Sequence, residues 1–222
     1  MNPRRGFALV VGLALAGCAG TPRHDDELAR VELLALLETL NADLLSHDSA
    51  TLTLERWCAD HRLAEPAKII ARRVRGETKV IPDALRAELA HGDAPLAYRH
   101  VQLACGERVL SEADNWYVPS RLTDDMNRRL DTTDEPFGKV VKPLGFRRRT
   151  LAANLVWSPL PAGWELRDGA QTAVPLRVPH EVLRHEAILY TSANVPFSAV
   201  VETYTNALFA FGAWPLEDAS SR

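Results

Sequence analysis

Cysteine is scarce in this sequence, with 3 residues in 222, and neither a CxxC pair nor a histidine-rich cluster occurs. Protein metal sites are commonly built from closely spaced cysteine and histidine ligands, so the sequence predicts no metal centre. Basic residues are not in excess either, because 26 Lys and Arg stand against 29 Asp and Glu, for a formal charge of −3. Nucleic-acid-binding domains usually carry a basic face, so we expect no nucleic-acid partner. The basic clusters at 72–75 and 147–149 are then most simply interpreted as solvent-facing.

The amino terminus lacks an apolar run long enough to span a membrane. Arg4 and Arg5 precede roughly ten apolar residues, whereas a helix that crosses the ~30 Å hydrocarbon core needs about 20. A positive start, a short apolar run and small residues at a cleavage point are typical of a secretory signal. We therefore predict that residues 1–17 are a signal peptide.

The residues at the expected cleavage point, Leu15-Ala16-Gly17-Cys18, resemble the lipobox of bacterial lipoproteins. This resemblance implies that Cys18 is diacylated, which anchors the chain because each buried methylene contributes about 0.8 kcal/mol. Ala19 follows in place of an acidic residue, which indicates a cell-envelope protein sorted to the outer membrane and facing the periplasm. An ordinary signal peptide with a chance cysteine is the alternative.

Removal of residues 1–17, with Arg4 and Arg5 among them, changes the formal charge from −3 to −5. The remaining chain is long enough to bury a sizeable core as one domain. Its only other cysteines are Cys58 and Cys105. In an oxidising periplasm an even pair can form one disulfide, whereas two buried free thiols are the other interpretation. The sequence leaves both open.

The first part of the exported chain is predicted to be mainly helical. Residues 18–26 are polar and contain a proline, so we expect a short tether. Apolar residues then recur at three- and four-residue intervals over 27–45, which predicts an amphipathic helix. Alternating Thr and Leu at 51–54 predict a strand, 57–60 a short helix or turn, and 67–74 another strand.

The second part has the alternation that is typical of paired strands. Residues 98–105 and 108–118 flank a Gly-Glu turn, which predicts a hairpin. Residues 182–190 and 197–204 predict a second hairpin in the same way.

Two further helices are expected between the hairpins, one at 122–130 and one that starts at 132–136 with a Thr or Asp cap. Residues 158–179 are rich in Pro and Gly and are expected to be loop-like. The order predicts an α+β domain with a mainly antiparallel sheet and flanking helices. We expect 27–94 to pack on 95–222 as one globular unit.

Three segments resemble the chorismate lyase (chorismate–pyruvate lyase) family, whose antiparallel sheet is also used by effector-binding domains of some bacterial transcription regulators. The resemblance covers roughly 95–205. It is carried by Tyr98-Arg99-His100-Val101-Gln102-Leu103 with its return strand, by the turn Pro136-Phe137-Gly138, and by the closing hairpin at 184–202.

The resemblance implies a pocket for a small aromatic carboxylate behind helical flaps, with no cofactor. Arg99 would bind the ligand carboxylate, because a guanidinium pairs with it in a bidentate manner. Glu202 would lie at the reacting ether, where desolvation in an apolar strand raises the pKa of a carboxyl group and makes it a general acid. Backbone amides of Phe137 and Gly138 would complete the site.

Each of these assignments has an alternative. Arg99 and Glu202 are equally compatible with solvent-facing positions on their strands, and Glu186 is a competing carboxylate. Residues 137–138 are also compatible with an ordinary helix start. The polar and aromatic side chains of Asn115 and Trp116 are candidates for the pocket lining, although aromatic residues on strands are more often core.

The sequence therefore supports two hypotheses about function. In the first, an envelope lipoprotein binds a small aromatic or carboxylate-bearing molecule, with carbon–oxygen lyase activity (chorismate to 4-hydroxybenzoate plus pyruvate) as its catalytic form. In the second, a non-catalytic envelope lipoprotein binds a protein partner or has a structural role.

Overall fold

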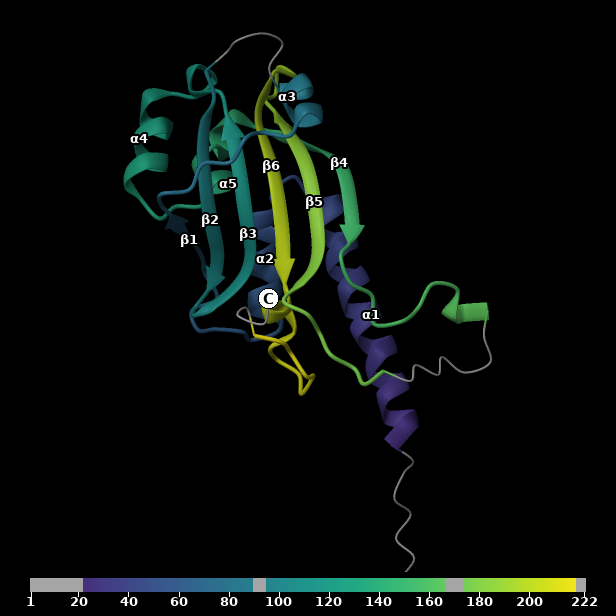
Figure 1. Ribbon diagram of the computed structural model, residues 1–222. Coiled ribbons are helices and arrows are strands. Elements are labelled where there is room, and N and C mark those ends of the chain that lie inside the picture. Colours follow the sequence, from purple (N-terminus) through teal and green to yellow (C-terminus); the bar gives the residue numbers. More distant parts are fainter. Residues whose placement is uncertain (1–21, 90–94, 167–173, 219–222) are drawn as a thin grey trace, which may run out of the picture.

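The computed structural model describes residues 22–89, 95–166 and 174–218. Its centre is a six-stranded antiparallel sheet with the strand order β1-β2-β3-β6-β5-β4 (Figure 1). The α+β architecture that the sequence predicts is confirmed. The strands are β1 Ile69–Val74, β2 Ala97–Cys105, β3 Arg108–Tyr117, β4 Arg147–Leu155, β5 Glu181–Tyr190 and β6 Pro196–Thr205, and the helices are α1 Pro22–Ser46, α2 Ala50–Asp60, α3 Asp83–Leu89, α4 Asp124–Thr132 and α5 Phe137–Val140.

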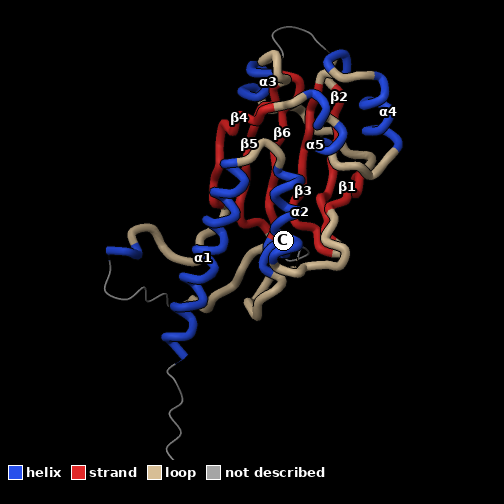
Figure 2. Tube along the Cα trace, turned by 180° about the vertical axis from the view of Figure 1, so that it is seen from behind, coloured by secondary structure: helices blue, strands red, loops and turns tan. Residues whose placement is uncertain are grey.

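Helices cover the sheet unequally on its two faces. Helices α1, α2 and α5 lie over one face, which Figure 2 shows from the front, and α3 lies over the upper end of the opposite face. The larger core cluster joins α1 and α2 to the sheet, and a smaller cluster joins α3 to Trp116 and Ile188. The face below α1, α2 and α5 therefore carries the larger core cluster, and the α3 face carries the smaller one.

Helix α1 confirms the amphipathic helix that is predicted over 27–45. Leu33, Leu37 and Leu40 are fully buried, whereas Leu28 is 56% exposed. The N-terminal half of α1 extends past the end of the sheet (Figure 1), although Leu33 within it still belongs to the larger core cluster. The helix already begins at Pro22, within the stretch predicted as a tether; proline is tolerated in a first helical turn, where its missing N–H costs no hydrogen bond.

The strand predicted at 51–54 is wrong, because these residues belong to α2. Ser49 caps the helix by accepting a hydrogen bond from Leu52 N at 3.4 Å. Leu54, Trp57 and Cys58 are buried together at helical spacing. Packing of this face onto the sheet outweighs the weak strand preference of two threonines.

Strand β4 and helix α3 were not predicted from the sequence, and the predicted Thr or Asp cap of α5 is wrong. Thr133 Oγ1 donates to Arg129 O at 2.8 Å, so it ends α4, and the N-cap of α5 is Pro136. Strand β4 contains the basic cluster at 147–149. Arg147 and Arg149 are exposed as expected, but Arg148 points to the helix-covered face and its side chain is only 5% exposed. The prediction that this whole cluster faces solvent is therefore wrong.

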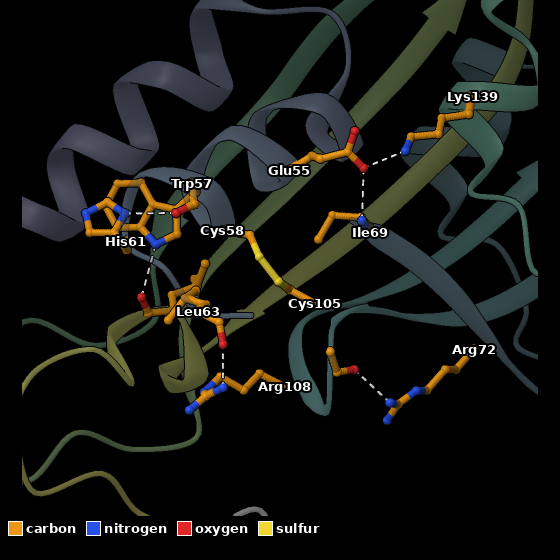
Figure 3. Close-up of a disulfide and its surroundings, with 12 residues drawn as sticks. Glu55, Trp57, Cys58, His61, Leu63, Ile69, Arg72, Cys105, Arg108 and Lys139 are labelled. Carbon is orange, nitrogen blue, oxygen red and sulfur yellow. Dashed lines mark hydrogen bonds and ion pairs between the residues drawn. A yellow bond between two sulfur atoms is a disulfide. The ribbon is translucent and has the colours of Figure 1, made fainter. Parts of the chain in front are cut away.

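Cys58 and Cys105 form a disulfide that joins α2 to the end of β2, with their Cα atoms 6.4 Å apart (Figure 3). Both residues are fully buried. One turn before Cys58 in α2, the Glu55 carboxylate accepts hydrogen bonds from Ile69 N at 2.9 Å and from Lys139 Nζ at 2.5 Å. A covalent bond and a charged cluster thus hold α2 against β1, β2 and α5.

Candidate functional site

A cavity of about 520 Å³, its open mouth included, lies between the sheet and the helices α2 and α5. Residues of β2, β3 and β6 form its floor, and residues 48–51 and 137–138 cover it. The lining residues are Asp48, Ser49, Ala50, Thr51, Arg99, Val101, Leu103, Ala113, Asn115, Phe137, Gly138, Phe146, Arg148, Leu189, Val200 and Glu202.

Arg99 is buried at one end of the cavity, with 2% of its surface exposed. Its guanidinium donates to the backbone oxygens of Glu135, at 3.2 and 3.3 Å, and of Thr133, at 3.4 Å. Within the described part of the chain it contacts no carboxylate, and its buried Nε has no hydrogen-bond partner. Burial, together with the nearby charge of Arg73, lowers the pKa of Arg99. The cavity therefore contains a buried cation whose hydrogen bonds are incomplete.

Glu202 lies at the other end and is paired with Arg148. Arg148 Nη2 is 2.6 Å from Glu202 Oε2, and the two side chains are 5% and 7% exposed. The hydroxyl of Tyr204 donates to the same carboxylate oxygen at 3.1 Å. Burial alone would lower the pKa of the Arg148 guanidinium, but the adjacent carboxylate raises it above its ordinary value. Glu202 is thus not surrounded by apolar groups alone, as the sequence predicts, but is paired with a buried arginine.

Phe137 and Gly138 border the cavity from above, at the start of α5. A Cβ atom at Gly138 would lie 3.1 Å from Ser49 Oγ and 3.5 Å from Thr51 Oγ1. Contacts near 3.1 Å are tighter than ordinary van der Waals packing, so a side chain here would require the Ser49 hydroxyl to shift by a few tenths of an ångström. Gly138 therefore allows α5 to approach the start of α2 closely.

Asn115 lines the cavity floor and accepts a hydrogen bond from Ser198 Oγ at 3.0 Å. Trp116 does not line it, and this prediction is corrected. Successive side chains of a strand point to opposite faces, so Trp116 faces α3. There its Nε1 donates to Lys79 O at 2.8 Å. Glu186, the competing carboxylate, also lies on that face, 3.4 Å from Arg184.

The polar residues around Glu202 were not predicted from the sequence as part of the site. Arg148 was not predicted because β4 was not predicted. Side chains alternate between the two faces of a strand, so Arg148 lies on the opposite face of β4 from Arg147 and Arg149. His185 is opposite Glu202 on β5, and its Nε2 donates to Asn41 Oδ1 at 2.9 Å. Burial and the charge of Arg148 lower its pKa to about 4, so it is neutral at pH 7.

In 22–89, 95–166 and 174–218, no group of three or more His, Cys, Asp or Glu side chains is arranged to hold a metal ion. Over the same ranges, no helix combines the length and the apolar character needed to cross a membrane.

Several solved structures are similar to this chain in fold. The effector domain of PhnF from Mycobacterium smegmatis is 13% identical with a TM-score of 0.45, and the match covers 72% of this chain and 89% of that one. The effector-binding domain of the trehalose repressor TreR from Bacillus subtilis is 8% identical with a TM-score of 0.35, over 69% of this chain and 98% of that one. A GntR-family regulator from Enterococcus faecalis V583 is 11% identical with a TM-score of 0.39, over 67% and 99%. At such scores the likeness says nothing about the ligand of this chain.

No family model matches the sequence. A much nearer similarity exists to the uncharacterized protein y4mC of Sinorhizobium fredii (strain NBRC 101917 / NGR234), which is 52% identical over 198 residues. The alignment covers 87% of this chain and 81% of that protein. The chain therefore belongs to the same protein family as y4mC.

Proposed function

We propose that this chain is an exported lipoprotein whose folded domain binds a small aromatic carboxylate in the cavity below α2 and α5. The observation that carries the proposal is the state of Arg99, which is buried, faces the cavity and has no carboxylate partner among the described residues. A buried charge is costly unless it is paired and hydrogen-bonded. A ligand carboxylate would supply both the charge and the missing acceptor.

The rest of the cavity supports a ligand with an apolar body. Val101, Leu103, Leu189 and Val200 contribute aliphatic surface, and Phe137 and Phe146 contribute rings. Small-molecule sites commonly combine such walls with a few polar groups that fix the orientation of the ligand. Arg99 at one end and the Arg148–Glu202 pair at the other are the polar groups here.

Export is supported by the sequence and by the disulfide. Cys18 and the signal peptide lie outside the described residues, so their roles rest on the amino-terminal sequence alone. The bond between Cys58 and Cys105 is of a kind that forms and persists mainly in oxidising compartments such as the bacterial periplasm. A periplasmic, outer-membrane-anchored location accommodates both features.

The proposal predicts that benzoate stabilises the protein through Arg99. In thermal unfolding of a chain that begins after Cys18, benzoate should raise the Tm in a saturable manner. Arg99→Gln should weaken binding about 10- to 100-fold, because a hydrogen-bonded charge pair contributes about 1.5–3 kcal/mol. Arg121→Gln is the matched control, since Arg121 also donates to backbone oxygens but lies outside the cavity. Equal benzoate affinity in wild type and Arg99→Gln would overturn the proposal.

Lyase activity is a second candidate, favoured by one observation: Arg99 and Glu202 border the same cavity. It is tested by incubating the same chain with chorismate and following 4-hydroxybenzoate and pyruvate by chromatography. Product above a Glu202→Gln control would identify a lyase. Binding of benzoate without turnover would identify a ligand-binding lipoprotein, and the absence of both would favour a role in binding a protein partner.

A further inference from the structure

The outer side of α1 bears a second stripe of regularly spaced residues. Its positions are three and four residues apart in alternation, and all of them are exposed: Leu28, Val31, Ala35, Glu38, Ala42 and Leu45. Two residues further on, the buried stripe of α1 repeats this spacing at Arg30, Leu33, Leu37, Leu40 and Leu44. Each residue of an α-helix turns it by about 100°, so the two stripes lie on nearly opposite sides of the helix.

The outer stripe is apolar apart from Glu38. Leu28, Val31 and Leu45 are 56%, 37% and 48% exposed, and α1 is the outer layer of the fold over this face of the sheet (Figure 2). Single exposed apolar side chains are ordinary on a protein surface. A heptad spacing that is kept along about 26 Å of helix is instead typical of a seam between two helices.

The width of the stripe and its surroundings indicate what would cover it. A stripe of only two positions in each heptad is the narrow seam of a coiled coil, whereas a helix in a membrane interface has a broader apolar face with Lys and Arg on its polar face. Among the described side chains of α1, at 26–46, the only Lys or Arg is Arg30. Arg30 is buried and donates to Asp26 and to the backbone oxygen of Pro159. The outer face therefore fits one partner helix better than a lipid surface.

The charges on the outer face indicate the kind of helix. Glu38 lies within the stripe and Glu32 lies beside it, and both are exposed. In the part of the chain that the structure describes, neither forms an ion pair with Lys or Arg, and Glu38 accepts a hydrogen bond from Asn41 Nδ2 at 3.1 Å. A second copy of α1 would bring the same acidic groups to the seam, and like charges opposed at an interface destabilise it. A helix that carries basic residues would complement this face.

We propose that the outer face of α1 is a docking site for a cationic amphipathic helix of another protein, with a Lys or Arg of that helix opposite Glu38. The apolar positions would supply affinity, and a single polar position within the seam would fix the register. None of the six outer positions lines the cavity between the sheet and α2 and α5. The inference therefore does not depend on which ligand the cavity binds.

The probe is a synthetic peptide of three heptads with leucine at positions a and d, one of them replaced by lysine, and with lysine at positions e and g. Repulsion among its lysines keeps the peptide from pairing with itself. A matched acidic peptide has glutamate in place of every lysine. Fluorescence anisotropy with the chain that begins after Cys18 should show the cationic peptide binding at least about tenfold more tightly than the acidic one.

Variants of exposed residues test the position of the site without disturbing the core. Leu28→Ser combined with Val31→Ser should weaken binding of the cationic peptide at least about tenfold, because two apolar contacts are lost. Val80→Ser is the matched control, since Val80 is 86% exposed and precedes α3 on the opposite face of the sheet. Glu38→Lys should reverse the preference and make the acidic peptide the tighter ligand, a gain that a loss of folding does not imitate.

Equal affinity for the two peptides, an unchanged preference in Glu38→Lys, or an equal loss in Val80→Ser would overturn the inference. Sedimentation of the same chain and its flotation with phospholipid vesicles test the other occupants. Dimers that the Leu28→Ser, Val31→Ser variant does not form would assign the face to a second copy. Vesicle binding that this variant loses would assign it to lipid. Either result would replace the partner helix.

Discussion

At the scale of single residues, two buried arginines in one cavity differ in what balances their charge. Arg148 has Glu202 at 2.6 Å, whereas Arg99 has only backbone oxygens. Removing one partner of a buried ion pair leaves an uncompensated charge and typically costs about 3–5 kcal/mol. Arg148 therefore belongs to the folded framework of the site. Arg99 donates only to backbone oxygens, and its Nε has no hydrogen-bond partner among the described residues.

His185 predicts a loss of stability in acid. Its pKa is about 4 in the folded protein, lowered by burial and by Arg148, against about 6.5 when unfolded. The neutral form is favoured by folding, so stability is complete above about pH 6.5 and falls as the pH drops towards 4. The difference corresponds to about 3 kcal/mol. Urea unfolding between pH 7 and pH 4 should show a steeper loss in the wild type than in His185→Gln.

Other acidic groups titrate over the same pH range in both proteins, so the comparison isolates the histidine. The glutamine side chain that His185→Gln introduces retains a donor for Asn41 Oδ1, in place of the hydrogen bond that His185 Nε2 makes. Parallel stability curves for the two proteins would contradict a lowered histidine pKa.

At the scale of elements, α2 determines the shape of the cavity cover. Its first residues line the cavity, its middle bears Glu55, and its last turn bears Cys58. The disulfide to Cys105 fixes α2 against β2, and the Glu55–Lys139 pair fixes α5 against α2. The cover is therefore held by contacts that lie outside the cavity itself.

Loss of the disulfide should lower the free energy of unfolding by about 4 kcal/mol, as the chain-entropy model gives for a sequence separation of 47. Urea unfolding of a Cys58→Ala, Cys105→Ala double variant checks this value. Wild-type protein treated with a thiol reductant in denaturant provides the matched reference, because it lacks the bond but keeps both side chains. A double variant as stable as oxidised wild type would show that the bond contributes nothing to folding.

At the scale of the whole molecule, the sheet is closed on one side by α1, α2 and α5, and the N-terminal half of α1 extends beyond it (Figure 2). Helix α1 begins at Pro22, four positions after Cys18. A lipid on Cys18 would therefore hold this extended end of α1 close to the membrane surface, with the sheet and its cavity further away.

The lipid anchor is tested by metabolic labelling with radioactive palmitate in a bacterial host that processes lipoproteins. The wild type should be labelled and recovered in the outer-membrane fraction, because two or more acyl chains anchor a protein stably. Cys18→Ala should lose both properties, and Cys58→Ala, which changes a cysteine within the folded domain, should keep the label. A labelled Cys18→Ala chain would show that the lipidation prediction is wrong.

Much of the fold was predictable from local pattern. The two hairpins, β1 and the long first helix follow from alternation and from apolar spacing, which depend on neighbours in the sequence. Strand β4, helix α3 and the helical state of 51–54 were not predictable in this way. Their side chains are buried by partners far along the chain, as Leu85 is buried against the opposite face of the sheet.

The sequence by itself determined the antiparallel α+β architecture and the signal-like amino terminus, and the family resemblance singled out Arg99 and Glu202, which line one cavity. Only the tertiary structure decided that Cys58 and Cys105 are bonded, that Trp116 faces away from the cavity, and that Arg148 reaches Glu202 across the sheet. The physical reason is that periodicity reports which face of an element is apolar. The partner of a buried charge depends instead on strand order and register, which long-range packing sets.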